Sequence, residues 1–336
     1  MPSSENRTPE FDPETLERAP FGNRAIRALL LADAGPIPGR VASAWLAAGN
    51  QIAEVWTDAN PGYRSAWKQD RRLGRFAARW SLTATIARKH LVHRRIENFK
   101  DSQKFADLID SLDIDVVLSV HFARILPAAL LSRLKVPALN LHPSLLPAYR
   151  GATPLVSMVF DDAQDRFSGV SLHQIVPAID AGPIYSACRV PFPSNKNLRR
   201  WELDLAKAGS DLAVNTIPRI LKGEIVGVEQ SENLATYRKT LSDDLKITPA
   251  RSAANIARLC ETLGRVRPLL IEADGRNYPV TGIVRSLGSP TGQSPRVGFF
   301  RIDADLADAR VRLRRKPSWE GRRRRLETRL LQVLSR

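Results

Sequence analysis

Short apolar runs and amphipathic stretches alternate along most of the sequence. Residues 25–31 have the pattern of a buried strand, and a turn rich in Gly and Pro leads from them to an amphipathic stretch at residues 40–48. That stretch stops at Gly49 and Asn50, after which residues 52–56 begin a second strand. The order strand, helix, strand is typical of a parallel sheet whose strands are connected by helices.

The alternation continues further along the chain. A basic region at residues 64–93 is predicted to be helical, and a further helix is predicted at residues 104–112. Residues 115–120 form a largely apolar run, as in parallel strands that are covered on both faces, and residues 137–141 are the next strand. This pattern predicts an open, doubly wound, mostly parallel Rossmann-like α/β sheet, in which ligands bind beyond the carboxyl ends of the strands.

The remaining pattern indicates a second, smaller domain. Residues 169–175 alternate like a strand, and residues 197–221 read as one or two helices that close the first domain. Beyond them a helix is expected at residues 252–263 and short strands at 269–272 and 278–285, so this part is predicted to be β-rich. The expected organisation is a disordered leader at residues 1–23, a first domain at 24–222, a linker at 223–234, a C-terminal domain at 235–305 and a basic tail at 306–336.

The composition is that of a folded protein. With 336 residues, of which 43% are hydrophobic, the chain can bury a substantial core in two domains. Cys188 and Cys260 are the two cysteines, which excludes a disulfide framework or a cysteine metal cluster and favours the cytoplasm. The leader lacks a secretory pattern, and no stretch reaches the roughly 20 apolar residues that a membrane helix needs. No membrane association is therefore expected.

The positive charge is concentrated in two segments. Residues 64–95 contain ten Lys or Arg and a single acid, Asp70, which gives a net charge of +9. Residues 310–336 contain eleven Lys or Arg against Glu320 and Glu327, which gives another +9 out of a total of +16. Clustered charge can meet several phosphates at once and therefore suits a polyanionic partner. Solvated basic helix faces without such a partner are an equally good interpretation at this point.

Asn140 and His142 are the first candidates for chemistry. They lie two residues apart at the end of a predicted strand, so their side chains leave on the same face and can converge on one small group. An amide donor beside an imidazole suits acyl transfer, in which negative charge grows on a carbonyl oxygen as an amine attacks. Taken alone, such a pair is more often a structural cap or a core feature, so both interpretations stay open.

Asp180 is the second candidate. It lies in a turn before Gly182 and Pro183, where a carboxylate can reach a neighbouring site. Beside an imidazole, that carboxylate is expected to raise the pKa of the ring and to relay a proton through water from the attacking amine. In isolation, an Asp in such a turn more often makes local backbone hydrogen bonds. His173, in the middle of its strand, is expected to be packed or to line the site rather than to act as the acid or base.

Together these stretches resemble the 10-formyltetrahydrofolate-dependent formyltransferase family. The run Asn-Leu-His-Pro-Ser-Leu-Leu-Pro from Asn140 and the Asp-Ala-Gly turn at Asp180 match the catalytic Asn, His and Asp of that family in their order. The resemblance implies that residues 24–222 are a formyltransferase catalytic domain, with Asn140, His142 and Asp180 as its catalytic residues and 10-formyltetrahydrofolate as its co-substrate. It also implies that the cofactor is held by Arg124, Ile125, Leu126, Pro127, Ser144, Leu145, Leu146, Pro147 and His173.

The resemblance extends into the second part of the chain. Residues 223–258, with Gln230 and Tyr237, resemble the domain junction of family members that act on methionyl-tRNA or on 4-amino-arabinose. Members that act on glycinamide ribonucleotide lack the second domain and are therefore less similar. The chain departs from the methionyl-tRNA members after the first strand, at residues 32–36, and again at Thr248 and Pro249. These departures affect the identity of the acceptor more than the folate chemistry.

The sequence leads to three hypotheses. The first is formyl transfer to the amino group of methionyl-tRNA, a role in protein biosynthesis in which segments 64–95 and 310–336 contact the tRNA. The second is formylation of a nucleotide-linked amino sugar or another small amine. The third, of another class, is a non-catalytic nucleic-acid-binding relative, and the presence of all three catalytic residue types argues against it. No metal is expected, because no His or Cys cluster has ligand spacing, and the sequence does not indicate the oligomeric state.

Overall fold

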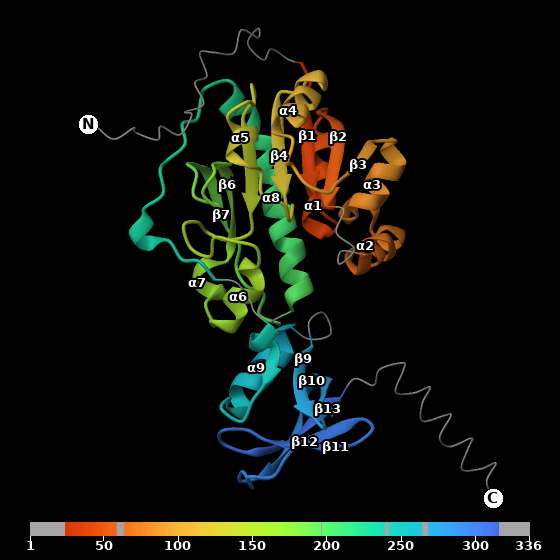
Figure 1. Ribbon diagram of the computed structural model, residues 1–336, viewed down its shortest axis with the longest axis vertical. Helices are drawn as coiled ribbons and strands as arrows, with labels where there is room; N and C mark the ends of the chain where they lie inside the picture. Colours follow the sequence, from red (N-terminus) through yellow and green to blue (C-terminus); the bar gives the residue numbers. More distant parts are fainter. Residues whose placement is uncertain (1–23, 59–63, 196, 239–241, 264–267, 316–336) are drawn as a thin grey trace, which may run out of the picture. The chain divides into compact units, whose positions relative to one another are not determined.

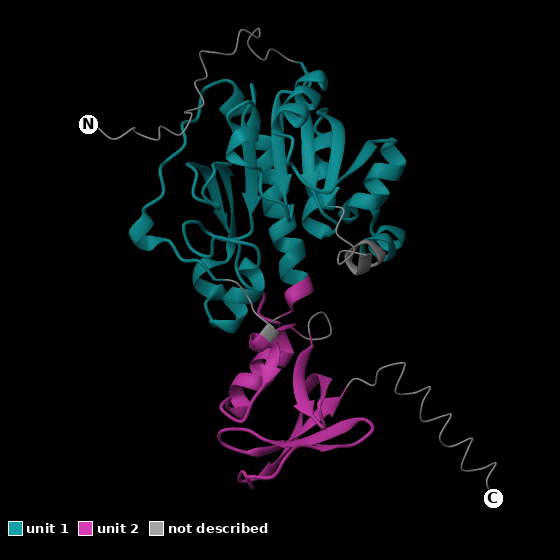
Figure 2. Cartoon of the chain, viewed as in Figure 1, with its two compact units in different colours: residues 1–192, 200–239 teal, residues 193–199, 240–336 magenta. Residues whose placement is uncertain are grey.

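The computed structural model describes residues 24–58, 64–195, 197–238, 242–263 and 268–315. The chain divides into two units, residues 1–192 with 200–239 and residues 193–199 with 240–336 (Figure 2). The predicted leader at residues 1–23 and most of the predicted tail, residues 316–336, lie outside the described residues. Each unit has a sheet of its own.

A seven-stranded sheet forms the centre of the first unit (Figure 1). Its strands are β1 (Arg27–Ala32), β2 (Gln51–Asp58), β3 (Val92–Ile96), β4 (Val116–Val120), β5 (Ala138–His142), β6 (Gly169–Gln174) and β7 (Ile184–Arg189). They lie in the order β3-β2-β1-β4-β5-β6-β7, with β1 to β5 parallel and with β6 and β7 antiparallel to their neighbours. The prediction of a doubly wound, mostly parallel sheet is thus confirmed. The order reverses between β1 and β4, where such sheets bind ligands.

Both faces of this sheet are covered. The helices of the unit are α1 (Pro36–Ala47), α4 (Ser102–Ser111), α5 (Ala128–Leu131), α6 (Pro154–Phe160), α7 (Gln164–Phe167) and α8 (Leu198–Leu221), together with those of the basic region. Leu29 and Val117 pack in a core that includes residues of α4 and α5, whereas Leu30 and Leu118, which point the other way, are also buried. Strands buried on both faces are apolar throughout, which explains the continuous apolar runs of the sequence. None of the described helices combines the length and apolar character needed to cross a membrane.

The basic region is helical as predicted, except at its end. It contains α2 (Arg64–Phe76), the 3-10 helix η3 (Ala78–Trp80) and α3 (Leu82–Lys89). The chain then forms β3 at the edge of the sheet, so the helical prediction is wrong at Val92 and His93. Four of the five residues of β3 are exposed, and charged side chains therefore replace the apolar run that marks an inner strand.

Asp70, the single acid of segment 64–95, is buried in the structure. Its carboxylate accepts hydrogen bonds from the Ser81 hydroxyl at 2.9 Å and from the backbone N–H groups of Leu82 at 3.2 Å and Thr83 at 2.9 Å. An acid in this place satisfies the free N–H groups at the start of α3 and interacts favourably with the helix dipole. Asp70 therefore stabilises the fold and does not lie among the exposed cations of the segment.

The second unit is built on a six-stranded sheet, and the prediction of a β-rich C-terminal domain is confirmed. Its strands are β8 (Lys246–Ile247), β9 (Leu269–Ala273), β10 (Arg276–Gly288), β11 (Arg296–Val297), β12 (Arg301–Asp305) and β13 (Arg310–Arg315), with α9 (Ala253–Leu263) preceding β9. All neighbours pair antiparallel except β8 and β9. Arg312 pairs with Asp303 at 2.6 Å and Arg310 with Asp305 at 2.8 Å, so β12 neutralises part of the charge at the start of the basic segment 310–336.

Two glycines give a matched test of the packing in the first unit. A Cβ atom on Gly39 of α1 would lie 2.6 Å from the backbone carbonyl of Trp80, so Gly39→Ala is expected to lower the free energy of unfolding by about 1–3 kcal/mol. A Cβ atom on Gly209 of α8 would meet Val170 at an ordinary 3.6 Å, so Gly209→Ala should leave stability unchanged or raise it by about 0.5–1 kcal/mol. Denaturant unfolding measures both changes, and equal stability of the two variants would contradict the close contact between α1 and η3.

Candidate active site

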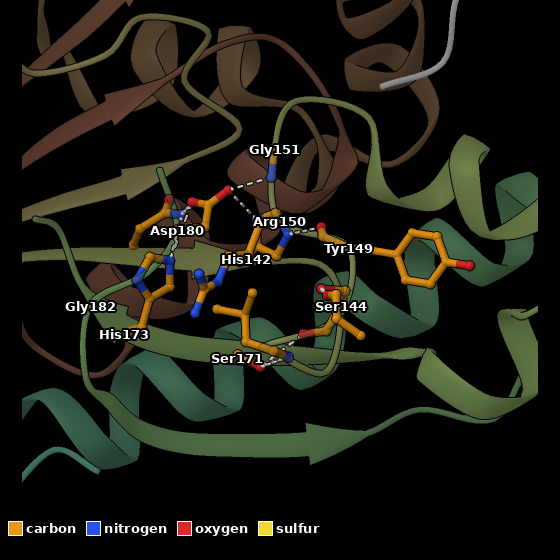
Figure 3. A network of polar contacts seen from close by, with 12 residues as sticks. His142, Ser144, Tyr149, Arg150, Gly151, Ser171, His173, Asp180 and Gly182 are labelled. Atoms are coloured by element: carbon orange, nitrogen blue, oxygen red, sulfur yellow. Dashed lines mark hydrogen bonds and ion pairs between the residues drawn. The ribbon is translucent and has the colours of Figure 1, made fainter. Parts of the chain in front are cut away.

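The end of β5 brings the sequence-predicted residues Asn140, His142, His173 and Asp180 together. Figure 3 shows the last three of them beside one another. Asn140 and His142 lie on one face of β5, because successive side chains of a strand alternate. β6 runs antiparallel to β5 and places His173 directly opposite Asn140. Asp180 comes from the loop between β6 and β7 and reaches the same point. The four side chains thus come from two paired strands and one loop.

Asp180 lies at the centre of this group. Its Oδ2 atom accepts the backbone N–H of Gly151 at 2.8 Å, and its Oδ1 atom accepts a hydrogen bond from Asn140 Nδ2 at 3.3 Å. His142 Nδ1 is 3.5 Å from Oδ2, and His173 Nε2 is 3.5 Å from Oδ1. Burial acts to raise the pKa of Asp180, but the two histidines and the Gly151 N–H outweigh it and hold the pKa well below its usual range. The carboxyl group is therefore ionised.

The two ring nitrogens of His142 both face oxygen atoms. Nε2 is 2.8 Å from the carbonyl oxygen of Tyr149, and Nδ1 faces the Asp180 carboxylate. Burial lowers the pKa of His142, and Asp180 and the Tyr149 carbonyl act in the opposite direction without overcoming it. The Asp180 carboxylate thus acts to raise this pKa, as the sequence leads us to expect, but the ring is almost completely buried and its burial has the larger effect. A neutral ring donates at one nitrogen only, and since Nε2 donates to the Tyr149 carbonyl, Nδ1 is an acceptor that can take up a proton beside Asp180.

The orientation of the Asn140 amide is set by its neighbours. His173 Nδ1 lies 2.8 Å from the carbonyl oxygen of Gln174 and so carries the proton, which makes Nε2 an acceptor. Asn140 Nδ2 donates one hydrogen to that Nε2 atom at 3.0 Å and the other to Asp180. The reverse orientation would point the amide oxygen at the carboxylate. His173 therefore lines the site and aligns Asn140, as the sequence indicates.

The predicted cofactor-binding residues Ser144, Leu145, Leu146 and Pro147 form the loop after β5. The Ser144 hydroxyl donates to the Ala148 carbonyl at 2.7 Å. The backbone N–H groups of Leu145 and Leu146 donate to the Phe167 carbonyl at 3.0 Å and to the Ser171 hydroxyl at 3.0 Å, respectively. The peptide bond before Pro147 is cis. These residues hold the loop in shape below His142.

The predicted residues Arg124, Ile125, Leu126 and Pro127 follow β4 and differ in their surroundings. Arg124 forms an ion pair with Asp58 at 2.5 Å, and Leu126 is buried against α5, which begins directly after Pro127. Ile125, in contrast, is 63% exposed, which is unusual for a large apolar side chain. Among these four residues, Ile125 is therefore the one that offers an apolar surface to a ligand.

The structure adds residues that the sequence reasoning did not assign to the site. Tyr149, Arg150 and Gly151 follow the predicted loop directly and contact His142 or Asp180 through their backbones or through neighbours. Tyr149 and Asp180 both have left-handed backbone conformations, with φ of 60° and 50°, which cost a non-glycine residue about 1–2 kcal/mol each. His121, at the end of β4, lies close enough to His142 to interact with it, and burial lowers its pKa to about 4. Only the position of Tyr149, Arg150 and Gly151 next to the motif could have indicated them from the sequence.

Comparison with known proteins identifies the fold and this motif. Residues 74–217 match the model of a family described as formyl transferase, and this segment contains both β5 and Asp180. This segment of the chain is thus similar to the formyl transferase family. Among the described residues, no group of three or more His, Cys, Asp or Glu is arranged to hold a metal ion.

Curated members of this family match about half of the chain. The methionyl-tRNA formyltransferase of Staphylococcus aureus (strain JH1) is 31% identical over 166 residues, which are 48% of this chain and 52% of that protein. The methionyl-tRNA formyltransferase of Dictyoglomus turgidum (strain DSM 6724 / Z-1310) is 30% identical over 151 residues, 45% of this chain and 48% of that protein. The chain thus spans about half the length of these relatives in the alignment.

Solved structures share the fold over a larger part of the chain. WlaRD, a sugar 3N-formyl transferase crystallised with dTDP and 5-N-formyl-THF, has a TM-score of 0.57 and 16% identity and covers 88% of this chain and 100% of its own. An N-formyltransferase from Helicobacter canadensis, in complex with folinic acid and dTDP-3-aminofucose, also has a TM-score of 0.57 and 16% identity, with coverage of 87% and 100%. HypX from Aquifex aeolicus, in complex with tetrahydrofolic acid, has a TM-score of 0.59 and 11% identity, with coverage of 86% and 44%.

The protonation of His142 tests this geometry without any ligand. We expect the ring to titrate below its ordinary value of 6.5, because it is buried, and Asp180→Asn to lower its pKa further, because the charge that favours the protonated ring is removed. The unfolded chain then takes up this proton more readily than the folded chain, so the free energy of unfolding should fall as the pH drops below about 6.5. NMR titration of the ring, assigned with His142→Gln, measures the pKa, and a rise in Asp180→Asn would contradict the geometry.

Proposed function

We propose that this chain transfers a formyl group from 10-formyltetrahydrofolate to a primary amine, and that the amine is the amino group of methionyl-tRNA. The observation that carries the proposal is the convergence of an amide, an imidazole and a carboxylate at the end of β5. Asn140 Nδ2 lies 3.3 Å and His142 Nδ1 lies 3.5 Å from the carboxylate of Asp180. This is a set of groups that can stabilise an oxyanion and hold a proton at the same place.

Asn140 and His142 act on the formyl oxygen in this proposal. As an amine attacks the formyl carbon, negative charge grows on that oxygen and is stabilised by hydrogen-bond donors that are already in position. The bond from Asn140 Nδ2 to Asp180 is long, at 3.3 Å, so this N–H can be redirected to the oxygen while the bond to His173 is kept. His142 Nδ1 can donate once it has taken up a proton.

Asp180 accepts the proton that the attacking amine loses in this proposal. The attacking nitrogen must lose a proton when the new C–N bond forms, and Asp180 is ionised and can receive it through water. His142 Nδ1, 3.5 Å away, lies where it can share that proton. The His142 ring thereby becomes a hydrogen-bond donor when the formyl oxygen carries negative charge. Proton transfer from the amine is thus coupled to stabilisation of that oxygen. When the bond between the formyl carbon and N10 of the folate breaks, this proton would pass to N10, so that tetrahydrofolate leaves as a neutral amine.

The residues near the site fit a folate. When bound, 10-formyltetrahydrofolate supplies an activated one-carbon unit. Ile125 exposes an apolar side chain on the loop after β4, near the point where the strand order reverses, which suits one face of a flat ring. The loop from Ser144 to Pro147 is held rigid by the bonds of Ser144 and Ser171, so it can offer a fixed edge to the same ligand.

The acceptor is supported by the curated relatives and by charge. Both relatives described above are methionyl-tRNA formyltransferases, and α2, η3 and α3 carry the exposed cations Arg71, Arg72, Arg75, Arg79 and Lys89. A tRNA offers the repeated phosphates that such a surface can meet. The second candidate is a nucleotide-linked amino sugar, because sugar N-formyltransferases resemble this chain over more of its length.

Replacing the three central residues tests the reaction. Asn140→Ala, His142→Ala and Asp180→Ala should each lower kcat by about 100-fold to 1,000-fold, because each removes a group that acts on the oxygen or on the proton. Release of tetrahydrofolate from 10-formyltetrahydrofolate, with a panel of aminoacyl-tRNAs and of amino-sugar nucleotides, measures the rate. Cys188→Ser, an exposed position on β7, is the control and should keep the rate of the unaltered protein. Near-normal rates in all three variants would refute the proposal.

The salt dependence of binding tests the acceptor. Affinity for methionyl-tRNA should fall steeply as salt rises, and combined Arg71→Ala, Arg72→Ala and Arg75→Ala should reduce the slope of log K against log salt by about 2–3, since roughly 0.7–0.9 of a counterion is released per neutralised phosphate. Replacing Arg199, Arg200 and Arg219 of α8 removes the same number of charges from another exposed surface and is the control. Weak binding with a shallow slope, together with turnover of an amino-sugar nucleotide, would favour the second candidate.

A further inference from the structure

After α8 the chain returns to the active-site loop. Val228 and Ile184 exchange two backbone hydrogen bonds of 2.8 and 2.9 Å, which fixes this segment beside the start of β7. Further along, the N–H of Thr236 donates to the carbonyl of Pro147 at 3.2 Å, and the N–H of Arg150 donates to the carbonyl of Thr236 at 2.9 Å. We call residues 228–237 the strap. It runs from β7 to the loop that follows β5, so it connects both sides of the site.

Gln230 of the strap bonds to both of these sides at once. Its Nε2 atom donates to the carbonyl oxygen of Asp180 at 2.9 Å and to that of Gly182 at 2.7 Å. Its Oε1 atom accepts from Arg150 Nε at 3.1 Å and from the second terminal nitrogen of that guanidinium at 3.0 Å. All four bonds require one orientation of the amide, because the reverse would set NH2 against the guanidinium and oxygen against two carbonyls.

Arg150 makes this link strong. Its side chain is fully buried, and a buried charge is costly unless its donors are satisfied. Besides Gln230, it bonds to the Tyr237 hydroxyl at 2.6 Å and pairs with Glu232 at 2.8 Å. All three partners belong to the strap. The guanidinium therefore fixes the strap, and Gln230 connects the strap to the turn that contains Asp180.

Thr236 acts on the other side of the site. Its hydroxyl accepts the N–H of Tyr149 at 2.8 Å, and its carbonyl accepts the N–H of Arg150. The peptide unit between these two donors carries the Tyr149 carbonyl that contacts His142 Nε2. Tyr149 also has a left-handed backbone, a conformation that persists only where its surroundings hold it. Thr236 is thus in a position to fix the direction of that carbonyl.

We propose that the strap is a latch on the active site, in which Gln230 is a positioning residue for Asp180 and Thr236 is a positioning residue for His142. This rests on the formyl-transfer function proposed above. The strap does not touch the reacting groups. Its effect is to fix two strained backbone positions, so that the Asp180 carboxylate and the Nε2 partner of His142 are in place before the substrates bind.

Gln230→Glu tests the first half of the latch in the full-length protein. The replacement keeps the shape and the bonds to Arg150 but sets an oxygen against the carbonyls of Asp180 and Gly182. We expect kcat to fall about 10-fold to 100-fold with little change in the KM for 10-formyltetrahydrofolate, as for a small misplacement of a reacting group. The loss should shrink at low pH, where the introduced carboxyl group is protonated and donates again. Val226→Glu adds the same charge at an exposed residue just before the strap and should leave kcat unchanged.

Thr236→Val and Thr236→Ser test the second half. Val keeps the shape but removes the hydroxyl, so kcat should fall and the NMR pKa of His142 should drop as its carbonyl partner loosens, whereas Ser should restore both. A kcat within about twofold of the unaltered protein for Gln230→Glu and Thr236→Val, with the His142 pKa unchanged in the latter, would overturn the latch. Absence of formyl transfer by the unaltered protein would instead refute the proposed function, and the His142 titration would still test the latch.

Discussion

The antiparallel pairing of β5 with β6 is the constraint on which the active site depends. It places His173 opposite Asn140 and Ser171 opposite His142, so each candidate catalytic side chain has a fixed neighbour. His173 aligns the amide of Asn140, and the hydroxyl of Ser171 bridges the carbonyl of Ser144 and the N–H of Leu146 below the imidazole. A parallel strand in the place of β6 would lose this register, in which Asn140 faces His173 and His142 faces Ser171.

Burial and hydrogen bonding together determine which groups of the site are charged. Asp180 stays ionised although it is largely buried, because a backbone N–H and side-chain donors are aimed at its oxygens. His142 is more deeply buried and has a lowered pKa, because desolvation outweighs the nearby carboxylate. The ionised carboxylate of Asp180 therefore lies beside the neutral ring of His142, and each of the two groups can accept a proton.

The parts of the fold that the sequence predicted are those in which one physical signal dominates. β1 and β4 are buried and largely apolar on both faces, and their apolar runs mark them, whereas β5 carries Asn140 and His142 on one face. β3 was missed because it lies at the edge of the sheet, and β12 and β13 because arginines and aspartates pair across them on the exposed face. Asn140, His142 and Asp180 were predicted from local motifs. The bonds of Arg150 to Gln230 and Glu232 join residues about eighty positions apart, and no local pattern records such a contact.

The buried guanidinium of Arg150 also sets the order in which the first unit can be completed during synthesis. The sheet and α8 are made from residues before 222, whereas every side-chain partner of Arg150 described here lies between residues 230 and 237. A growing chain that has exposed only its first 222 residues lacks all of these partners for the guanidinium. The bonds from Arg150 to the strap can therefore form only after these residues have left the ribosome, and a fragment that ends after α8 would lack them.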